Sequence, residues 1–284
     1  MFTPRTSVTL EKLRNGETVF SFKSNLSCPR ALEIAAMNGF SCLWVCEEHV
    51  ANDYSVLESQ ILAAGCLGAD LLVRVPRGSY SDLVKPLELD AAGIMVPHVM
   101  SAEDARTIVR SVRFHPLGRR AIDGGNRDGA YCNMDFQEYL RFVNHNRFVL
   151  IQIEDVEALE ELDKICAVPG IDIIFFGPGD FNQSIGRPGE FDHPDIAAAR
   201  RKVAEAALRA GQCGGIDCGR VPFHQFRFRR GWSRRLLPGT AFPDDEKSHT
   251  QHRHGKVKMT GNSDDSVSNA SFSTGEEAFF CKIN

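Results

Sequence analysis

Two carboxylate residues follow short apolar segments of this 284-residue sequence. Glu154 comes directly after residues 148–153, and Asp180 comes shortly after residues 171–176. Both segments are rich in β-branched and aromatic residues, which is typical of strands buried on both faces. Parallel strands place their carboxyl ends on one rim, where the two carboxylates could bind one divalent cation. The alternative is that each carboxylate only stabilises the start of a helix.

The residues around these carboxylates suggest a place for an anionic substrate. Gly177 and Gly179 flank a proline just before Asp180, and glycine lets backbone N–H groups approach an anion closely. A substrate carboxylate could therefore dock beside the metal. Gln152 lies inside the segment before Glu154, so its amide needs a buried partner, which is either the substrate or a neighbouring strand.

Three further residues could carry acid–base or charge-stabilising chemistry. Arg74 ends a buried apolar segment, so it either forms a salt bridge or binds a keto oxygen and stabilises a developing enolate. His49 follows another such segment, and imidazole exchanges protons near neutral pH, although a lone histidine is more often exposed or capping. Asp90, just before a fourth segment, could orient His49 or occupy a turn.

The elements that position these residues alternate between strand-like and helix-like patterns from about residue 16 to residue 211. We predict strands over residues 18–22, 42–46, 71–75, 93–96, 149–153 and 173–176, with a seventh starting near Gly214. Helices are predicted over residues 29–37, 54–64, 80–87, 101–112, 137–143, 156–166 and 194–210. This alternation favours an α/β fold with a parallel sheet and helical crossovers. The glycine-rich residues 113–133 are interpreted as a mobile flap over the rim, or as a surface loop without a role.

Composition narrows the class of protein. Hydrophobic residues make up 43% and charged residues 25% of the chain, and the net charge is -4, which argues against a nucleic-acid partner. No apolar segment approaches the roughly 18 residues of a membrane span, so no membrane contact is expected. The nine cysteines are scattered without C-x-x-C pairs, which indicates reduced thiols and a cytoplasmic protein.

The sequence changes character after about residue 218. Residues 219–238 carry six arginines and no acid, and the remainder is polar without periodicity. We therefore predict a barrel domain over residues 1–218 and an atypical, disordered tail over residues 219–284. The arginine-rich and aromatic part of the tail could bind nucleic acid, but a solvated segment is the simpler interpretation.

The motifs, taken in order, resemble those of the HpcH/HpaI aldolase family, metal-dependent lyases of the phosphoenolpyruvate/pyruvate superfamily. The resemblance covers most of residues 15–216. The motifs that carry it are Glu48-His49, Leu72-Val-Arg-Val-Pro76, Gly93-Ile-Met-Val-Pro97, Gln152-Ile-Glu154 and Gly177-Pro-Gly-Asp-Phe181.

The resemblance implies a modified TIM (β/α)8 barrel and a class II pyruvate aldolase of the aldehyde-lyase type. Such an enzyme cleaves a 2-keto-4-hydroxy acid to pyruvate and an aldehyde through a metal-bound enolate. By the resemblance, Glu154 and Asp180 bind Mg²⁺, or Mn²⁺ or Co²⁺, and Arg74 stabilises the enolate. His49, oriented by Asp90, acts as the base.

The resemblance also implies the substrate contacts and the assembly. Gln152 and the backbone of Gly179 and Asp180 would hold the keto acid, and a homo-oligomer is expected. The chain departs from the family at Cys46, where an aspartate is usual, and beyond Ile216. We therefore expect strands 7 and 8 and the final helix to be missing or aberrant. The alternatives are an oxaloacetate decarboxylase-type enolate enzyme and an inactive, incomplete barrel.

Overall fold

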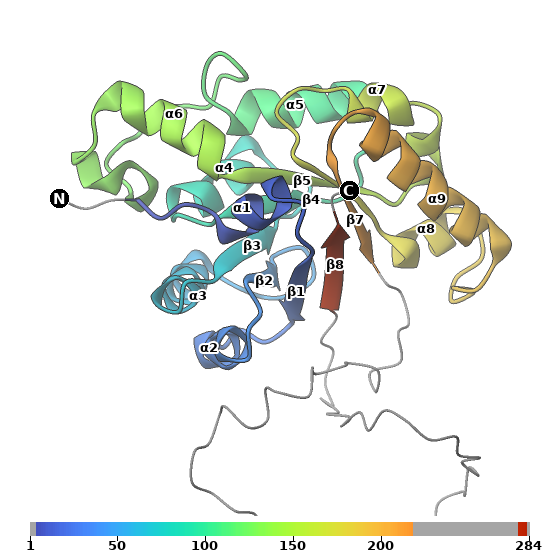
Figure 1. Ribbon diagram of the computed structural model, residues 1–284, viewed down its shortest axis with the longest axis horizontal. Coiled ribbons are helices and arrows are strands. Elements are labelled where there is room, and N and C mark those ends of the chain that lie inside the picture. Colours follow the sequence, from blue (N-terminus) through green and yellow to red (C-terminus); the bar gives the residue numbers. More distant parts are fainter. Residues whose placement is uncertain (1–3, 218–277, 283–284) are drawn as a thin grey trace, which may run out of the picture. The chain divides into compact units, whose positions relative to one another are not determined.

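The computed structural model describes residues 4–217 and 278–282, whose strands form one closed ring in chain order (Figure 1). The strands are β1 (Val19–Ser24), β2 (Cys42–Cys46), β3 (Asp70–Arg74), β4 (Gly93–Val96), β5 (Phe148–Ile153), β6 (Ile173–Phe176), β7 (Cys213–Asp217) and β8 (Ala278–Lys282). Neighbouring strands from β1 to β7 are parallel, so their carboxyl ends share one rim. The predicted α/β barrel is confirmed.

Helices connect the strands and cover the outside of the ring (Figure 1). The α-helices are α1 (Val8–Arg14), α2 (Pro29–Met37), α3 (Tyr54–Cys66), α4 (Tyr80–Glu88), α5 (Ala102–Val112), α6 (Phe136–Asn146), α7 (Leu162–Cys166), α8 (Pro178–Ser184) and α9 (Pro194–Arg209). Two short 3-10 helices are η1 (Arg127–Cys132) and η2 (Val156–Leu159). Among the described residues, no helix has the length and apolar character needed to span a membrane.

Two separate layers of core explain why the strands are apolar on both faces. Successive side chains of a strand point to opposite faces, so alternate residues enter the barrel interior or the layer beneath the helices. Trp44, Leu72, Met95, Leu150 and Phe175 fill the interior. Their immediate neighbours along the chain, such as residues 43, 45, 71, 73, 94 and 151, pack in the outer cluster with the helices. Every residue of β2 to β6 is consequently buried.

Helix α1 closes the amino-terminal end of the barrel. Leu10 and Leu13 of this helix belong to the interior cluster. The hydroxyl of Ser7, which caps the helix, donates to the carboxylate of Asp70 at 2.6 Å, and the N–H of Thr9 donates to the same oxygen at 2.8 Å. Asp70 begins β3 and is fully buried, so these bonds fix α1 against the ends of the strands.

The last two strands correct one expectation. Strand β7 is not missing, because it pairs in parallel with β6. Strand β8 departs from a TIM barrel, because it runs antiparallel to both β1 and β7. It comes from residues 278–282, which we assigned to the tail, and by pairing with both neighbours it leaves neither of them as an open edge. The expectation that the final helix is missing or aberrant concerns a part of the chain outside the described residues, as does the rest of the predicted tail, 219–277 and 283–284.

The segment 113–133, interpreted from the sequence as a mobile flap or a surface loop without a role, is anchored by buried polar contacts. Arg120, 3% exposed, pairs with fully buried Asp128 at 2.7 Å. The hydroxyl of Tyr139 in α6 donates to the same Asp128 carboxylate at 3.0 Å. The N–H of Ala121 donates to the hydroxyl of Tyr80 in α4 at 2.7 Å. The segment is therefore tied to α4 and α6.

Candidate functional site

The carboxyl ends of β2 to β6 bring together most of the predicted site residues. Arg74 is the last residue of β3, Gln152 lies in β5, and Glu154 follows β5 directly. Asp180 lies in the first turn of α8, which follows β6. Because these strands are parallel neighbours, the side chains converge on one rim.

Glu154 is the most deeply buried carboxylate at this rim, being 1% exposed. One of its oxygens accepts a hydrogen bond from the Gln152 amide at 2.8 Å, and the other accepts from the backbone N–H of His98 at 2.9 Å. Burial raises the pKa of the Glu154 carboxyl to about 7, and the nearby charge of Asp180 acts in the same direction. A bound cation would relieve this cost, because it favours the charged carboxylate.

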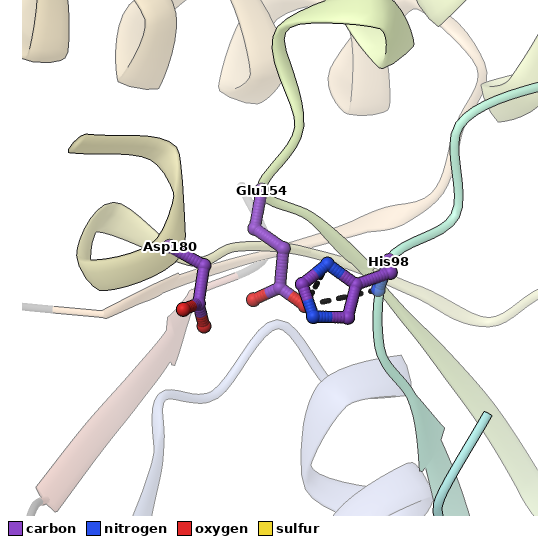
Figure 2. Close-up of side chains that lie close together, drawn as sticks. All are labelled: His98, Glu154 and Asp180. Atoms are coloured by element: carbon purple, nitrogen blue, oxygen red, sulfur yellow. Dashed lines mark hydrogen bonds and ion pairs between the residues drawn. The ribbon is translucent and has the colours of Figure 1, made fainter. Parts of the chain in front are cut away.

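Three side chains could act together as metal ligands. His98, Glu154 and Asp180 each offer one ligand atom, and these atoms lie within 4.8 Å of one another. Figure 2 shows the His98 ring beside the Glu154 carboxylate, with Asp180 on the other side of Glu154. The three residues come from the loop after β4, the end of β5 and helix α8.

The surroundings of Glu154 fit a cation. The Oε1 atom of Gln152 is buried and has no hydrogen-bond partner among the described residues, so one oxygen donor at the site is unused. A Cβ atom added at Gly177 would lie closer than 3.0 Å to Glu154 Oε2. Glycine at this position thus leaves room for the carboxylate. The donors are carboxylate and amide oxygens with an imidazole, which are ordinary ligands of divalent metals.

Arg74 is held in place by three neighbours at the rim. Its Nε lies 3.0 Å from Glu48 Oε2, and its Nε and Nη2 each lie 3.2 Å from the sulfur of Cys46. The guanidinium also stacks over Trp44, with 5.1 Å between its central carbon and the ring centroid. The side chain is almost fully buried, so its positive charge is shielded from water but remains near Glu154. Such a preorganised cation can stabilise negative charge on a substrate oxygen.

His49 lies in the loop after β2 and its side chain is 62% exposed. Its Nε2 is 3.5 Å from a carboxylate oxygen of Glu48, which also pairs with Arg74. The backbone N–H of His49 donates to the Cys46 sulfur at 3.3 Å. The imidazole is thus open to solvent at the rim and is linked to Arg74 through Glu48.

Asp90 does not meet His49 within this chain. It precedes β4, whereas His49 follows β2, so the two residues lie at opposite ends of parallel strands. The Asp90 carboxylate instead forms an ion pair with Arg147, just before β5, and lies 3.4 Å from Arg127. The predicted orienting role of Asp90 is therefore wrong for a single chain, and Glu48 occupies the place beside the imidazole.

Sequence reasoning missed His98. This residue follows β4 and has a φ of 52°, in the left-handed region that side chains other than glycine rarely adopt. Its Nδ1 lies 2.9 Å from an Asp155 oxygen. Burial lowers the pKa of His98, but the Asp155 hydrogen bond and the charges of three nearby carboxylates outweigh it and raise the pKa overall. The sequence could have pointed to His98 through its position just after a strand, because the same criterion identified Arg74 as a candidate.

Gly179 lies at the surface beside Asp180, and a Cβ atom built there would meet no other atom within 4 Å. Among the described residues, no side chain therefore covers the backbone at Gly179 from the side where a Cβ would lie.

The chain is similar to several known proteins. The family model described as HpcH/HpaI aldolase/citrate lyase matches residues 19–217. A hydroxypyruvate/pyruvate aldolase of Pseudomonas aeruginosa is 32% identical, over 72% of this chain and 76% of its own. A 2-keto-3-deoxy-L-rhamnonate aldolase of Klebsiella pneumoniae is also 32% identical, over 73% of this chain and 76% of its own. The crystal structure of an HpcH/HpaI aldolase from Desulfitobacterium hafniense matches with a TM-score of 0.70 and 32% identity, over 74% of this chain and 81% of that one.

Proposed function

This chain belongs to the HpcH/HpaI aldolase/citrate lyase family, and we propose that it is a class II aldolase. Its substrate would be a 2-keto-4-hydroxy acid, cleaved to pyruvate and an aldehyde, as the names of the similar aldolases suggest. One observation carries the proposal: a buried guanidinium, a buried amide and two carboxylates, from Arg74, Gln152, Glu154 and Asp180, gather at the carboxyl rim of the barrel.

The cleavage needs a base and a means of stabilising negative charge. The base takes the proton of the 4-hydroxyl group, the C3–C4 bond breaks, and the aldehyde leaves. The electron pair of that bond moves into the keto group as an enolate, and protonation at C3 then gives pyruvate. We assign the base to His49, which is exposed at the rim beside Glu48. Arg74, which is buried and held by Glu48 and Cys46, would stabilise the enolate oxygen.

The remaining residues would bind the metal and the keto acid. Glu154 and Asp180 would hold a divalent cation, Mg²⁺ or Mn²⁺ or Co²⁺, which when bound acts as a Lewis acid on the keto group. Gln152 would keep the Glu154 carboxylate in position through its 2.8 Å hydrogen bond. The backbone at Gly179 and Asp180 would hold the substrate carboxylate, since no described side chain covers Gly179 from the side where a Cβ would lie.

Hydrogen exchange on pyruvate tests the enolate half of this reaction without knowledge of the aldehyde. Purified protein is incubated with pyruvate and Mg²⁺ or Mn²⁺ in D₂O, and the methyl protons are followed by NMR. We expect metal-dependent exchange that is lost in Glu154→Gln, which keeps the shape of the side chain but not its charge. A folded, metal-loaded protein without exchange would overturn the proposal.

The bond that is broken is tested by product analysis. We expect 2-keto-4-hydroxy acids to yield pyruvate and an aldehyde, whereas release of CO₂ from oxaloacetate alone would identify a decarboxylase that uses the same enolate chemistry.

We further propose that the protein acts in the cytoplasm as a homo-oligomer. The six cysteines whose side chains the structure describes are free thiols, which supports a reducing compartment. Helices α2 and α3 expose Ile34, Met37 and Leu62, and Leu67 directly after α3 is exposed as well. Apolar side chains of this kind are ones that subunit contacts cover. Light scattering on the eluate of a sizing column would give the mass, and a strictly monomeric protein would contradict the assembly.

A further inference from the structure

We infer that His98 is a third protein ligand of the cation, and that the site therefore selects a transition metal over Mg²⁺. The inference rests on the proposed function, since it concerns the same metal centre. It goes beyond that function by assigning a nitrogen ligand and a class of metal.

The position of His98 permits this role. Its ring offers a nitrogen within 4.8 Å of a carboxylate oxygen from each of Glu154 and Asp180. Ligand atoms bound to one ion at about 2.0–2.2 Å must lie closer than twice that distance to one another. Small side-chain rotations therefore suffice to bring the three atoms around one ion. The ring is 34% exposed, so a cation can approach it from solvent.

The backbone of His98 is fixed from both sides. Its N–H donates to Glu154 at 2.9 Å, and its carbonyl accepts a hydrogen bond from Arg77. These bonds hold the residue at a φ of 52°, which a histidine does not adopt without cost. Rare backbone conformations persist when the surroundings impose them, and they are concentrated at functional sites.

The ring itself is oriented for metal binding. Nδ1 lies 2.9 Å from an Asp155 oxygen, so an Nδ1–H group donates to that carboxylate. Ligation of a cation through Nε2 would require that this nitrogen give up its proton, and Nε2 is free to do so because it lies 3.7 Å from Glu48, too far for a hydrogen bond. A histidine that donates to a carboxylate through one nitrogen and ligates metal through the other is a recurrent arrangement in metal sites.

An imidazole ligand changes which metal the site prefers. Mg²⁺ is a hard cation that takes oxygen ligands and retains water, whereas imidazole suits first-row transition metals. Affinity for such a mixed site rises from Mn²⁺ through Co²⁺ to Ni²⁺. A nitrogen in place of a third oxygen therefore favours Co²⁺ and Mn²⁺ over Mg²⁺.

Two variants and one control separate His98 from the rest of the site. His98→Asn tolerates a positive φ and replaces nitrogen with an oxygen donor, and His98→Ala removes the ligand altogether. His49→Ala removes the other histidine of the rim, which is not among the candidate ligands. Calorimetric titrations with Co²⁺ and with Mg²⁺ give the affinities. Binding that survives in Glu154→Gln, such as to histidines elsewhere in the chain, is subtracted.

We expect both His98 variants to bind Co²⁺ about 10- to 100-fold more weakly than the unsubstituted protein and His49→Ala. The Mg²⁺ affinity of His98→Asn should change by less than about threefold. Pulsed EPR of the Mn²⁺-loaded protein should show coupling to a nitrogen nucleus that disappears in both variants. Circular dichroism verifies that each variant is folded.

Equal losses for both cations, unchanged Co²⁺ affinity or absence of the nitrogen coupling would overturn the inference. These outcomes are distinct from failure of the proposed function. If pyruvate exchange occurs but His98 does not bind metal, the function stands without the inference. If His98 binds metal but no exchange occurs, the function fails and the metal site remains. A folded protein that binds neither cation would overturn both.

Discussion

The guanidinium of Arg74 contacts the thiol of Cys46 through two nitrogens, each 3.2 Å from the sulfur. The same sulfur accepts the backbone N–H of His49 at 3.3 Å. One fully buried thiol thus positions both the residue proposed to stabilise the enolate and the loop that carries the proposed base. The HpcH/HpaI resemblance places an aspartate at this position, and here a sulfur atom serves as the acceptor.

Removing the sulfur should impair catalysis more than stability. In Cys46→Ala, Arg74 keeps its contact with Glu48 but loses two others, so the guanidinium and the His49 loop shift slightly. We expect kcat/KM for cleavage to fall about 10- to 100-fold, because small displacements at a reacting centre have effects of this size. The kcat/KM of Cys46→Ser, which retains an acceptor, should lie between those of the unsubstituted protein and Cys46→Ala. Equal activity of all three proteins would show that Cys46 only fills space.

Substituting Gly177 should displace Glu154, a proposed metal ligand, without unfolding the barrel. The new Cβ of Gly177→Ala would collide with Glu154 Oε2, and the buried carboxylate would have to move. We expect the affinity for divalent cations to fall about 10- to 100-fold in titration calorimetry. Gly179→Ala is the matched control, because a Cβ there meets nothing within 4 Å and should leave the affinity unchanged. Similar affinities of both variants would contradict the described position of Glu154.

The stability of the protein should depend on pH through Glu47. Burial, with a contribution from the Asp82 charge, raises the pKa of the Glu47 carboxyl from 4.5 to about 7. The folded protein therefore holds this proton more tightly than the unfolded chain does. The resulting stabilisation is complete below pH 4.5 and is lost as the pH rises to about 7.

Glu47→Gln removes this titration. Relative to the unsubstituted protein, we expect the variant to gain on the order of 1–2 kcal/mol of unfolding free energy between about pH 5 and about pH 8, a value reduced for partial exposure. Urea unfolding at both pH values measures the difference. Glu58→Gln, at an exposed position on α3, corrects for the change in net charge. Parallel pH profiles for all three proteins would rule out this role of Glu47.

The buried pair of Arg120 and Asp128 should be essential to stability. Asp128→Asn leaves the Arg120 guanidinium, 3% exposed, without its carboxylate. We expect the free energy of unfolding to fall by about 3–5 kcal/mol. Tyr139→Phe, which removes only one hydrogen bond to Asp128, should cost about 1 kcal/mol. Chemical denaturation measures both, and a loss below about 1 kcal/mol in Asp128→Asn would mean that water reaches the pair.

Local pattern was sufficient to predict the strands and the residues at their carboxyl ends. Strand β4 has the predicted limits, and Arg74, Gln152 and Glu154 lie where the apolar segments end. Both faces of these strands are buried, so their sequences are continuous apolar runs that stand out. The direction of the strands also explains why Asp90 does not orient His49 within one chain. A residue before a strand and a residue after one lie at opposite rims of a parallel barrel.

Two features were not predicted from the sequence pattern. His98 follows Pro97 in an irregular loop. Its closeness to Glu154 depends on a positive φ, which the sequence pattern does not predict. Strand β8 pairs with β1 although some 250 residues of sequence separate them, as in the register of Phe20 with Phe280. Such long-range pairing is selected by closure of the ring and not by local propensity.

Side chains such as Trp44 and Phe175 fill the interior of the barrel, and Leu10 and Leu13 of α1 pack at its far end, so small molecules reach the proposed site from the carboxyl rim. In a site that opens on one side, the product that lies nearer the opening leaves first. Under the proposed reaction, pyruvate lies innermost against Arg74 and Gln152, and the aldehyde lies nearer the mouth. The aldehyde must then leave first, so pyruvate should inhibit cleavage by competing with the substrate, whereas the aldehyde should inhibit without competing. The order of product release would thus follow from the filled interior of the barrel behind the proposed site.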